Sequence, residues 1–501
     1  MFIRRAFFLF CIPLILMGFA SAHAQATDER LAQFEQIIQD EMAYYNIPGT
    51  AVAIIEGDEV IYAQGFGYRN VEDQLPFTTE TRFRVGSTTK SMTSLLIAQL
   101  VDDGLLAWDT PVTDILPDFA LSDSELTAQI TVADLMGMAT GLVSNTFDAF
   151  DWWEWEIDSL LDAVATQTIN GEFRASHNYN NEVYALAGYV GAVASGLEPT
   201  LTSYQSLMQT RLFDPIGMAS AIIADDHSQL GDNYAEPYEP DVLSEAGTVS
   251  RMIDAPIALV APAGGVWVNI EDMAKYVITQ MNGGVTPDGA RIVSAENLAV
   301  TWAPGASLGL DDVPGYEDAR YGMGWLLNTY RDIPMRQHNG AWSGYTTQMT
   351  IFPDNHTAIL VFSNSSLGGQ LNDTLAFTFA ELWNGLDLQA AAQRRAEFAP
   401  LIAQLDQVRE LAESTIDADT AAPLVGAYQA GWSVEYRDDS TLWLTNGVWA
   451  FRLVYFPVLG QYLVVNNGAL GATVDFNTIN EPTSLAINVG GTEAYTLEKV
   501  E

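Results

Sequence analysis

The sequence contains very little cysteine and histidine. Its single cysteine is Cys11, and only five of its 501 residues are histidines. Cys11 falls in a segment that we expect to be removed, which excludes disulfides, thiolate catalysis and cysteine-ligated metals from the mature protein. The histidines form no H-E-x-x-H pattern and no close pair, so the sequence predicts no metal site and no cofactor.

Positive charge is also scarce. The chain has 21 Lys and Arg residues against 64 Asp and Glu residues, which gives a formal net charge of −43. A surface this acidic repels a phosphate backbone, so nucleic acid is not expected as a partner. Such acidity suits either simple solubility or life in salty water, and the composition leaves both interpretations open.

Long hydrophobic runs are absent beyond the beginning of the chain. Arg4 and Arg5 precede an apolar run over residues 6–19, and small residues follow as far as Ala24. This order is typical of a cleavable export signal at residues 1–24, by either the general secretory or the twin-arginine route. The run is too short for a stable membrane anchor. We therefore expect an exported protein, periplasmic or extracellular, with no anchor after cleavage.

The rest of the chain predicts an α+β fold. β-rich runs flank Glu56–Asp58 and again Pro353–Asn355, which indicates two hairpins, while the patterns between residues 105 and 247 are helical. We expect one antiparallel sheet that is closed by both ends of a hydrolase unit and flanked by helices and a helical subdomain. The predicted bounds are 25–387 for this unit, 388–423 for a helical linker and 424–501 for a small all-β, barrel-like domain.

Ser87 and Lys90 open a predicted helix that is apolar nearly all round. Their spacing of three puts the hydroxyl and the amine on one face, where a desolvated lysine can accept the hydroxyl proton. A capping serine beside an incidental lysine is the structural alternative, because S-x-x-K is a short and frequent pattern. The chain has only three lysines, Lys90, Lys275 and Lys499. A buried, unpaired lysine is costly, which favours a catalytic role for this one.

The residues that follow carry a resemblance to a known family. S-T-T-K at 87–90 and the helix after it resemble the serine β-lactamase-related hydrolases, which include class C β-lactamases, D-aminopeptidases, D-alanyl-D-alanine carboxypeptidases and family VIII carboxylesterases. The stretches ITVADLMGMATGL, LFDPIGM, APAGGVWVNIEDMAKY and YGMGW are similar to the same family, so the resemblance covers about residues 47–383. It implies a β-lactamase/transpeptidase-like fold. The C-terminal domain loosely resembles the lipocalin-like domains appended to some members, where it would gate the cleft or mediate assembly.

The resemblance also implies roles for Tyr179 and Asn181, which match the family motif Y-x-N. A phenol beside a lysine can hold or relay a proton, and a side-chain amide can bind a substrate carbonyl. An asparagine-rich turn with a packed tyrosine is the structural alternative. His177, two residues earlier, is expected at the surface, with a place along the cleft as the alternative.

The third family motif, K-T-G in β-lactamases, is matched by His338, Asn339 and Gly340. The resemblance implies that this strand flanks the cleft, and that the Ala341 amide forms the oxyanion hole together with the amide of Ser87. Histidine is only partly charged near neutral pH, so it should hold a substrate carboxylate more weakly than lysine does. This departure favours esters, amides or peptides over efficient β-lactam hydrolysis.

Two other patterns carry less weight. Gly305–Gly309 matches G-x-S-x-G, but a nucleophile elbow requires a strand before the serine and a helix after it, and the flanking residues predict a loop instead. A group of aromatic residues fits either an acyl-binding wall or ordinary core packing. Its members are Phe147, Phe150, Trp152, Trp153 and Trp155.

Taken together, the sequence predicts a serine hydrolase that cleaves small-molecule esters, amides or peptides through an acyl-enzyme on Ser87, with Lys90 and Tyr179 as proton acceptors. A weak class C-like β-lactamase is one alternative. A non-catalytic envelope binding or receptor protein on the same fold is another. The sequence is compatible with a homo-oligomer and does not decide the oligomeric state.

Overall fold

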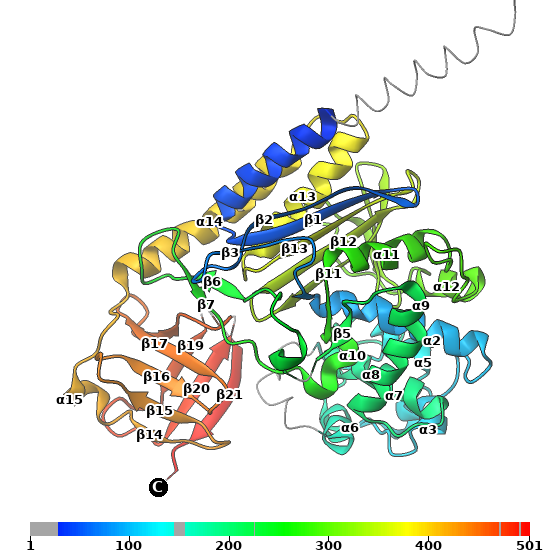
Figure 1. Ribbon diagram of the computed structural model, residues 1–501. Coiled ribbons are helices and arrows are strands. Elements are labelled where there is room, and N and C mark those ends of the chain that lie inside the picture. Colours follow the sequence, from blue (N-terminus) through cyan, green and yellow to red (C-terminus); the bar gives the residue numbers. More distant parts are fainter. Residues whose placement is uncertain (1–28, 145–155, 225, 470–471, 490–491, 501) are drawn as a thin grey trace, which may run out of the picture.

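The computed structural model describes residues 29–144, 156–224, 226–469, 472–489 and 492–500. The export signal predicted at residues 1–24 and the predicted aromatic group at 147–155 lie outside these described residues. Two sheets of eight strands each organise the chain, and helix α14 (Ala390–Leu411) leads from the first to the second (Figure 1).

The first sheet is antiparallel and has the order β3-β2-β1-β13-β12-β11-β10-β9. The two predicted hairpins are present as β1–β2 and β12–β13. Ala53 of β1 lies opposite Leu360 of β13, so both ends of the unit meet in one sheet, as the sequence predicts. In sheet order the strands are β3 (Leu75–Pro76), β2 (Glu59–Asn70), β1 (Gly49–Glu56), β13 (Thr357–Ser363), β12 (Tyr345–Phe352), β11 (Ile333–Trp342), β10 (Leu326–Tyr330) and β9 (Glu317–Tyr321).

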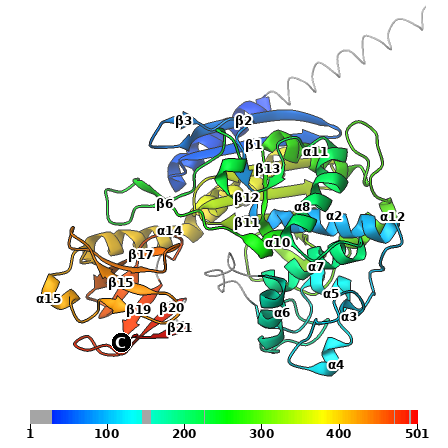
Figure 2. The ribbon, with the colours of Figure 1, turned by 60° about the horizontal axis from the view of Figure 1, so that its bottom comes forward.

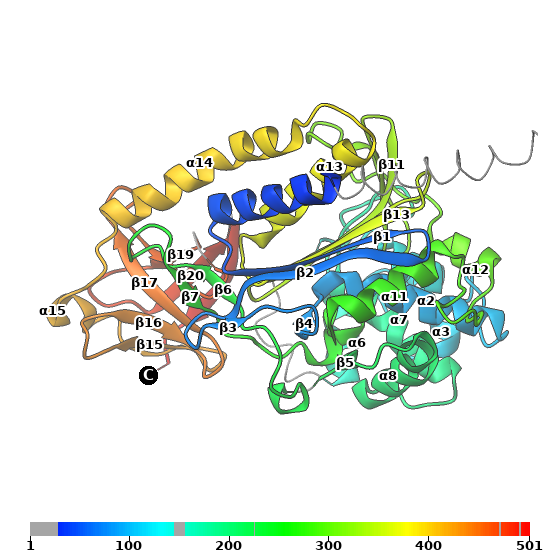
Figure 3. The same ribbon diagram turned by 45° about the horizontal axis from the view of Figure 1, so that its top comes forward.

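Helices cover both faces of this sheet, which explains why its central strands are apolar without alternation. On one face the helix at residues 29–45, α13 (Gly368–Trp383) and α14 enclose a core around Phe34 and Phe379. On the other face α2 (Thr89–Asp102) and α11 (Ile270–Met281) belong to the larger core (Figure 3). The central strands are therefore buried from both sides.

The predicted helical subdomain packs against α2, away from the sheet (Figure 2). Its central helix is α7 (Asn181–Ala194), which begins one residue before the predicted start at Glu182. Besides α2, α7 and α11, the α-helices between β3 and β9 in the described residues are α3 (Val112–Ile115), α4 (Ser124–Thr127), α5 (Val132–Gly137), α6 (Ile157–Thr166), α8 (Leu201–Met208), α9 (Asp214–Ile216), α10 (Ala261–Gly264) and α12 (Ala295–Thr301). Short strands of this region are β4 (Phe83–Arg84), β5 (Ile222–Ile223), β6 (Tyr238–Pro240), β7 (Val249–Arg251) and β8 (Val266–Val268).

The C-terminal domain is all-β, as predicted. Its strands pair in chain order around a core that includes Trp432 and Phe451. The sheet curls until a bridge joins Tyr428 to Lys499, so its two edges meet. A single turn of helix, α15 (Ala418–Ala421), precedes it. The strands are β14 (Gly426–Ala427), β15 (Ser433–Tyr436), β16 (Leu442–Thr445), β17 (Ala450–Phe456), β18 (Gln461–Val464), β19 (Thr473–Phe476), β20 (Ser484–Val489) and β21 (Thr492–Glu498).

Candidate active site

Ser87 lies in a tight turn just before α2. Gly86–Thr88 form one 3₁₀ turn, which α2 continues. The carbonyl oxygen of Val85 accepts hydrogen bonds from Thr88 Oγ1 at 2.7 Å and from Thr347 Oγ1 of β12 at 2.8 Å. The turn is therefore tied to the main sheet, and it leaves Ser87 half-buried within an otherwise buried segment.

Lys90, one turn later, is fully buried, and its Nζ lies 3.2 Å from Ser87 Oγ. The same nitrogen donates to Asn181 Oδ1 at 2.7 Å and to the Ala263 carbonyl at 2.9 Å. Burial holds the pKa of Lys90 well below its usual value. A neutral amine has two N–H groups and one lone pair. Since Asn181 Oδ1 and the Ala263 carbonyl oxygen are both acceptors, the two N–H groups of the neutral form point to them and its lone pair faces the Ser87 hydroxyl.

Tyr179 completes the surroundings of the serine. Its hydroxyl donates to Ser87 Oγ at 2.6 Å, and its ring lies 4.7 Å from Lys90 Nζ. Burial raises the pKa of Tyr179 above its usual value, against the opposing effect of the hydrogen bond with Ser87. The phenol is therefore protonated and a donor. Asn180 fixes its position, because its side chain accepts from Val183 N at 3.0 Å and caps α7.

Two glycines let strand β11 approach the serine turn. A β-carbon on Gly340 would lie 2.0 Å from the Val85 carbonyl oxygen and 3.0 Å from Ser87 N, and one on Gly86 would lie 2.8 Å from Ala341 N. No side chain fits at either position. Gly86 also has a φ of 54°, which favours glycine. The backbone amides of Ser87 and Ala341 are consequently neighbours, and Ala341 itself is exposed.

His338 of β11 is buried and fully engaged by the protein. Its Nε2 lies 2.8 Å from the Tyr321 hydroxyl, and its Nδ1 contacts the carbonyl oxygen of Asn339. Burial lowers the pKa of His338 to about 3. The ring is therefore neutral, with Nδ1–H donating to the carbonyl and Nε2 accepting from Tyr321. It has no ring nitrogen left for a substrate carboxylate.

Tyr321 is a site residue that sequence reasoning did not identify. Besides bonding His338, its ring stacks on His177 at 4.4 Å. His177 is half-buried rather than on the surface, and burial lowers its pKa to about 4. Tyr321 begins the stretch YGMGW, and Ala263 lies in APAGG. Both residues lie in stretches that resemble the family, and this position in the sequence is the signal that could have identified them.

The G-x-S-x-G match lies in a loop, as predicted, and it borders a different cavity. Ser307 Oγ accepts a hydrogen bond from Gly309 N at 3.2 Å. Gly305–Ser307 form part of the wall of a cavity of about 590 Å³, which Arg174 and Tyr321 also line. Tyr321 lines this cavity and also bonds His338, and the described contacts of Ser307 include no acid–base pair.

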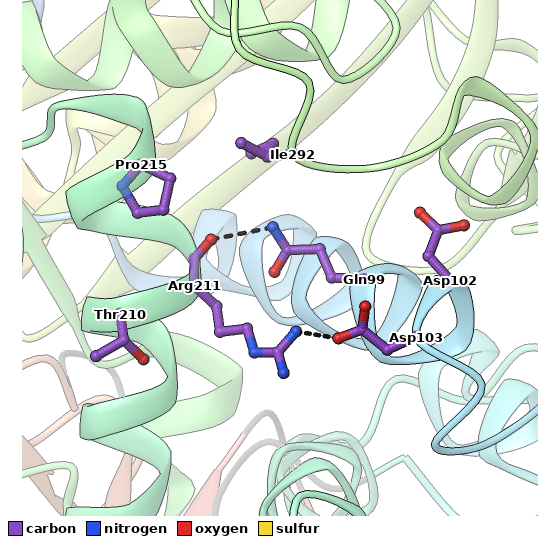
Figure 4. Close-up of a pocket in the computed structure, with 7 residues that line it drawn as sticks. All are labelled: Gln99, Asp102, Asp103, Thr210, Arg211, Pro215 and Ile292. Atoms are coloured by element: carbon purple, nitrogen blue, oxygen red, sulfur yellow. Dashed lines mark hydrogen bonds and ion pairs between the residues drawn. The ribbon is translucent and has the colours of Figure 1, made fainter.

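A smaller surface pocket of about 230 Å³ lies at the opposite end of α2 from Ser87 (Figure 4). Gln99 donates to the Arg211 carbonyl at 3.0 Å, and the Arg211 guanidinium pairs with Asp103. These contacts join the end of α2 to the segment that precedes α9. The pocket contains no nucleophile beside a base, so we assign it no part in the chemistry.

Over the described ranges, no group of three or more His, Cys, Asp or Glu side chains is placed to hold a metal ion. Within the same ranges, no helix combines the length and apolarity needed to cross a bilayer.

An antiparallel sheet covered by helices on both faces, with a serine, a buried lysine and a tyrosine at the edge of a helical subdomain, defines the β-lactamase/transpeptidase-like class of fold. Sequence comparison agrees. The profile of the Beta-lactamase family matches residues 34–378, and the chain belongs to that family.

Relatives of this chain include penicillin-binding proteins and hydrolases. Penicillin-binding protein 4 of Amycolatopsis lactamdurans is 26% identical over 366 residues, covering 71% of this chain and 89% of that protein. The unguisins hydrolase ungD′ of Aspergillus campestris is 24% identical and covers 88% of this chain and 84% of that protein. The octameric penicillin-binding protein homologue from Pyrococcus abyssi has a TM-score of 0.60 at 20% identity, covering 94% of this chain and all of that one. These relatives support a protein of the serine hydrolase kind.

Proposed function

We propose that this protein hydrolyses esters or amides through a covalent acyl-enzyme on Ser87. The observation that carries the proposal is the position of Ser87 Oγ between the amine of buried Lys90 at 3.2 Å and the phenol of Tyr179 at 2.6 Å. A serine hydroxyl is a weak nucleophile until a base accepts its proton, and a desolvated neutral lysine is such a base.

In the proposed acylation step, the hydroxyl proton of Ser87 moves to Lys90 Nζ while Oγ attacks the substrate carbonyl carbon. The carbonyl oxygen becomes an oxyanion that accepts from the amides of Ser87 and Ala341. Collapse of this intermediate breaks the ester or amide bond, and the leaving group takes a proton through Tyr179. Water then attacks the acyl carbon and loses a proton to the same amine. The bond between the acyl carbon and Ser87 Oγ breaks, Oγ takes that proton back from the amine, and a carboxylic acid leaves.

We propose neutral esters, amides or peptides as the substrates rather than β-lactams. The neutral ring of His338 supports this choice, because it offers no positive charge where the K-T-G motif has its lysine. Asn181 would orient the substrate carbonyl with its amide group while its oxygen holds Lys90. One relative is named a hydrolase of unguisins and others are named penicillin-binding proteins, so peptides and penicillins both belong in a substrate panel.

A fluorophosphonate probe and a substrate panel test the proposal together. We expect peptide mass mapping to locate the label on Ser87. Turnover of p-nitrophenyl acetate should exceed that of a chromogenic cephalosporin, by roughly tenfold or more in kcat/KM, because the anchor for a carboxylate is missing. Stoichiometric labelling without turnover would instead support the receptor alternative, and faster cleavage of the cephalosporin would support a β-lactamase.

The pH dependence of kcat/KM follows from the pKa of Lys90. The amine acts as a base only when neutral, so activity should fall as pH decreases through its pKa, which burial holds well below the usual lysine value. Activity at neutral pH is therefore expected. The pKa of Tyr179 is raised, so its phenol stays protonated and should cause no alkaline loss below about pH 10. A profile that rises only near pH 10 would contradict a desolvated lysine base.

Export and self-association are further parts of the proposal. The charge and hydropathy pattern of residues 1–24 supports cleavage of an export signal and a periplasmic or extracellular location. The Pyrococcus abyssi homologue is described as octameric, which makes a homo-oligomer a proposal for this chain as well. N-terminal sequencing of the secreted protein and light scattering of the purified protein test the two points.

A further inference from the structure

The contact between the hydrolase unit and the β domain contains a buried carboxylate. Glu239 of β6 is 2% exposed. Its two oxygens accept the backbone N–H groups of Asn467 and Gly468, the latter at 3.0 Å, from the loop between β18 and β19. Both residues have positive φ, 54° and 75°. Successive N–H groups turned toward one point form a concave anion site, so the loop is shaped to hold this carboxylate.

The same loop also holds a second segment of the hydrolase unit. Asn467 Oδ1 accepts from Ile253 N at 3.0 Å, and the neighbouring Met252 N donates to the Pro237 carbonyl at 2.9 Å. The β6–β7 hairpin lies between the first sheet and the β domain in two different views (Figures 1 and 3). The loop thus connects β6 and residues 252–255 to the β domain.

Residues 254–255 in turn contact both sides of the predicted oxyanion hole. Arg84, three residues before Ser87, pairs with Asp254 at 3.1 Å and donates to the Ala255 carbonyl at 3.4 Å. Trp342, the residue after Ala341, donates from Nε1 to the same carbonyl at 2.9 Å. The Ala255 carbonyl oxygen therefore accepts from one side chain three residues before Ser87 and from another one residue after Ala341.

We propose that Glu239 is a positioning residue for the acyl-transfer site. Its carboxylate lies in the Asn467–Gly468 nest of the β domain and so fixes this loop against residues 252–255. These residues in turn set the spacing between the amides of Ser87 and Ala341. The inference rests on the proposed function for its kinetic consequence. Its structural consequence can be measured without any activity.

Burial raises the pKa of Glu239 to about 7, and Asp241 adds to this, against the lowering effect of the two backbone N–H groups. A carboxylate is costly to bury. If this contact only had to hold the two domains together, apolar residues would be sufficient, so the buried carboxylate favours a more specific role. Assays at about pH 8 keep Glu239 mostly ionised, so that all variants are compared with one charge state of the wild type. Because its pKa is raised in the folded protein, this ionisation costs stability as pH rises through about 7.

The test replaces Glu239 with Gln and with Ala, and uses Glu245→Gln as a matched control. Glu245 is an exposed acidic residue of the same β6–β7 connection. Full loss of one oxyanion donor costs about 10² to 10³ in rate, so a displaced donor should lower kcat for p-nitrophenyl acetate about tenfold in Glu239→Ala. KM should change less than about twofold, because the donors act on the transition state. Glu239→Gln, which keeps one acceptor, should fall between.

Hydrogen exchange of the peptide at residues 338–345 provides the second measurement. We expect faster exchange there in Glu239→Ala and no change in Glu245→Gln. If Glu239→Ala does not fold by circular dichroism, Asn467→Ala serves in its place, because it removes the bond from Ile253 N together with the bond to the Ala450 carbonyl. Unchanged kcat and exchange in folded variants would overturn the proposal. If the wild-type protein shows neither labelling nor turnover, the proposed acyl chemistry is wrong. Hydrogen exchange would still show whether Glu239 affects the backbone at residues 338–345.

Discussion

Replacing Ser87 with alanine should reduce ester hydrolysis by roughly 10⁵-fold or more in kcat, because the covalent route is lost entirely. Fluorophosphonate labelling should disappear as well. Ser87 is half-buried, and its hydroxyl bonds only to groups of the site, Lys90 and Tyr179, among the described contacts. The fold should therefore be unaffected, and the melting temperature is expected to stay within a few degrees of wild type.

Ser307→Ala is the matched control for this variant. Ser307 occupies the centre of the G-x-S-x-G match, and its hydroxyl accepts only from Gly309 N in the described contacts. We expect wild-type kcat and labelling from this variant. Residual turnover above about 1% in Ser87→Ala, or a loss in Ser307→Ala, would show that another nucleophile acts.

The second large effect is expected at Lys90. General-base catalysis contributes about 10² to 10⁴ in rate, so Lys90→Met should lower kcat/KM by roughly 10³-fold. Lys90→Arg should lose a similar amount, although it keeps positive charge and donors, because a guanidinium stays protonated and cannot accept the Ser87 proton. Comparing the two variants shows whether Lys90 acts as a base or only through its positive charge, because arginine keeps the charge but cannot accept a proton. Single-turnover acylation with p-nitrophenyl acetate measures the step directly.

Lys275→Met is the control for the loss of a lysine. The Lys275 side chain is partly exposed, pairs with Asp272 at 2.6 Å and donates to the Gly217 carbonyl at 2.8 Å, and none of its described contacts involves Ser87. Its replacement should leave kcat/KM unchanged. Some stability should be lost, because the Asp272 side chain is only 7% exposed and would keep its bond from Ser220 N without the lysine. A Lys90→Arg variant within about tenfold of wild type would contradict the assignment of Lys90 as the base.

The site was predictable from sequence to different degrees along the chain. Ser87 and Lys90 are three residues apart on one helix, so local geometry alone brings them within reach. Tyr179 and Asn181 were located through the family resemblance, and the structure brings both to Lys90 and Ser87. His338 was expected to hold substrate, but Tyr321 and a backbone carbonyl occupy its ring nitrogens, which no local pattern around residue 338 reveals.

The amino-acid sequence alone determined the hairpins β1–β2 and β12–β13, the buried helix α2 and the all-β character of the C-terminal domain, because these depend on residue periodicity and turns over short distances. Only the tertiary structure decided that His338 is neutral and that Glu239 lies in a nest of the β domain. Both properties depend on desolvation and on hydrogen-bond partners that are distant in the chain. A side chain's charge state and its partners are properties of the folded surroundings.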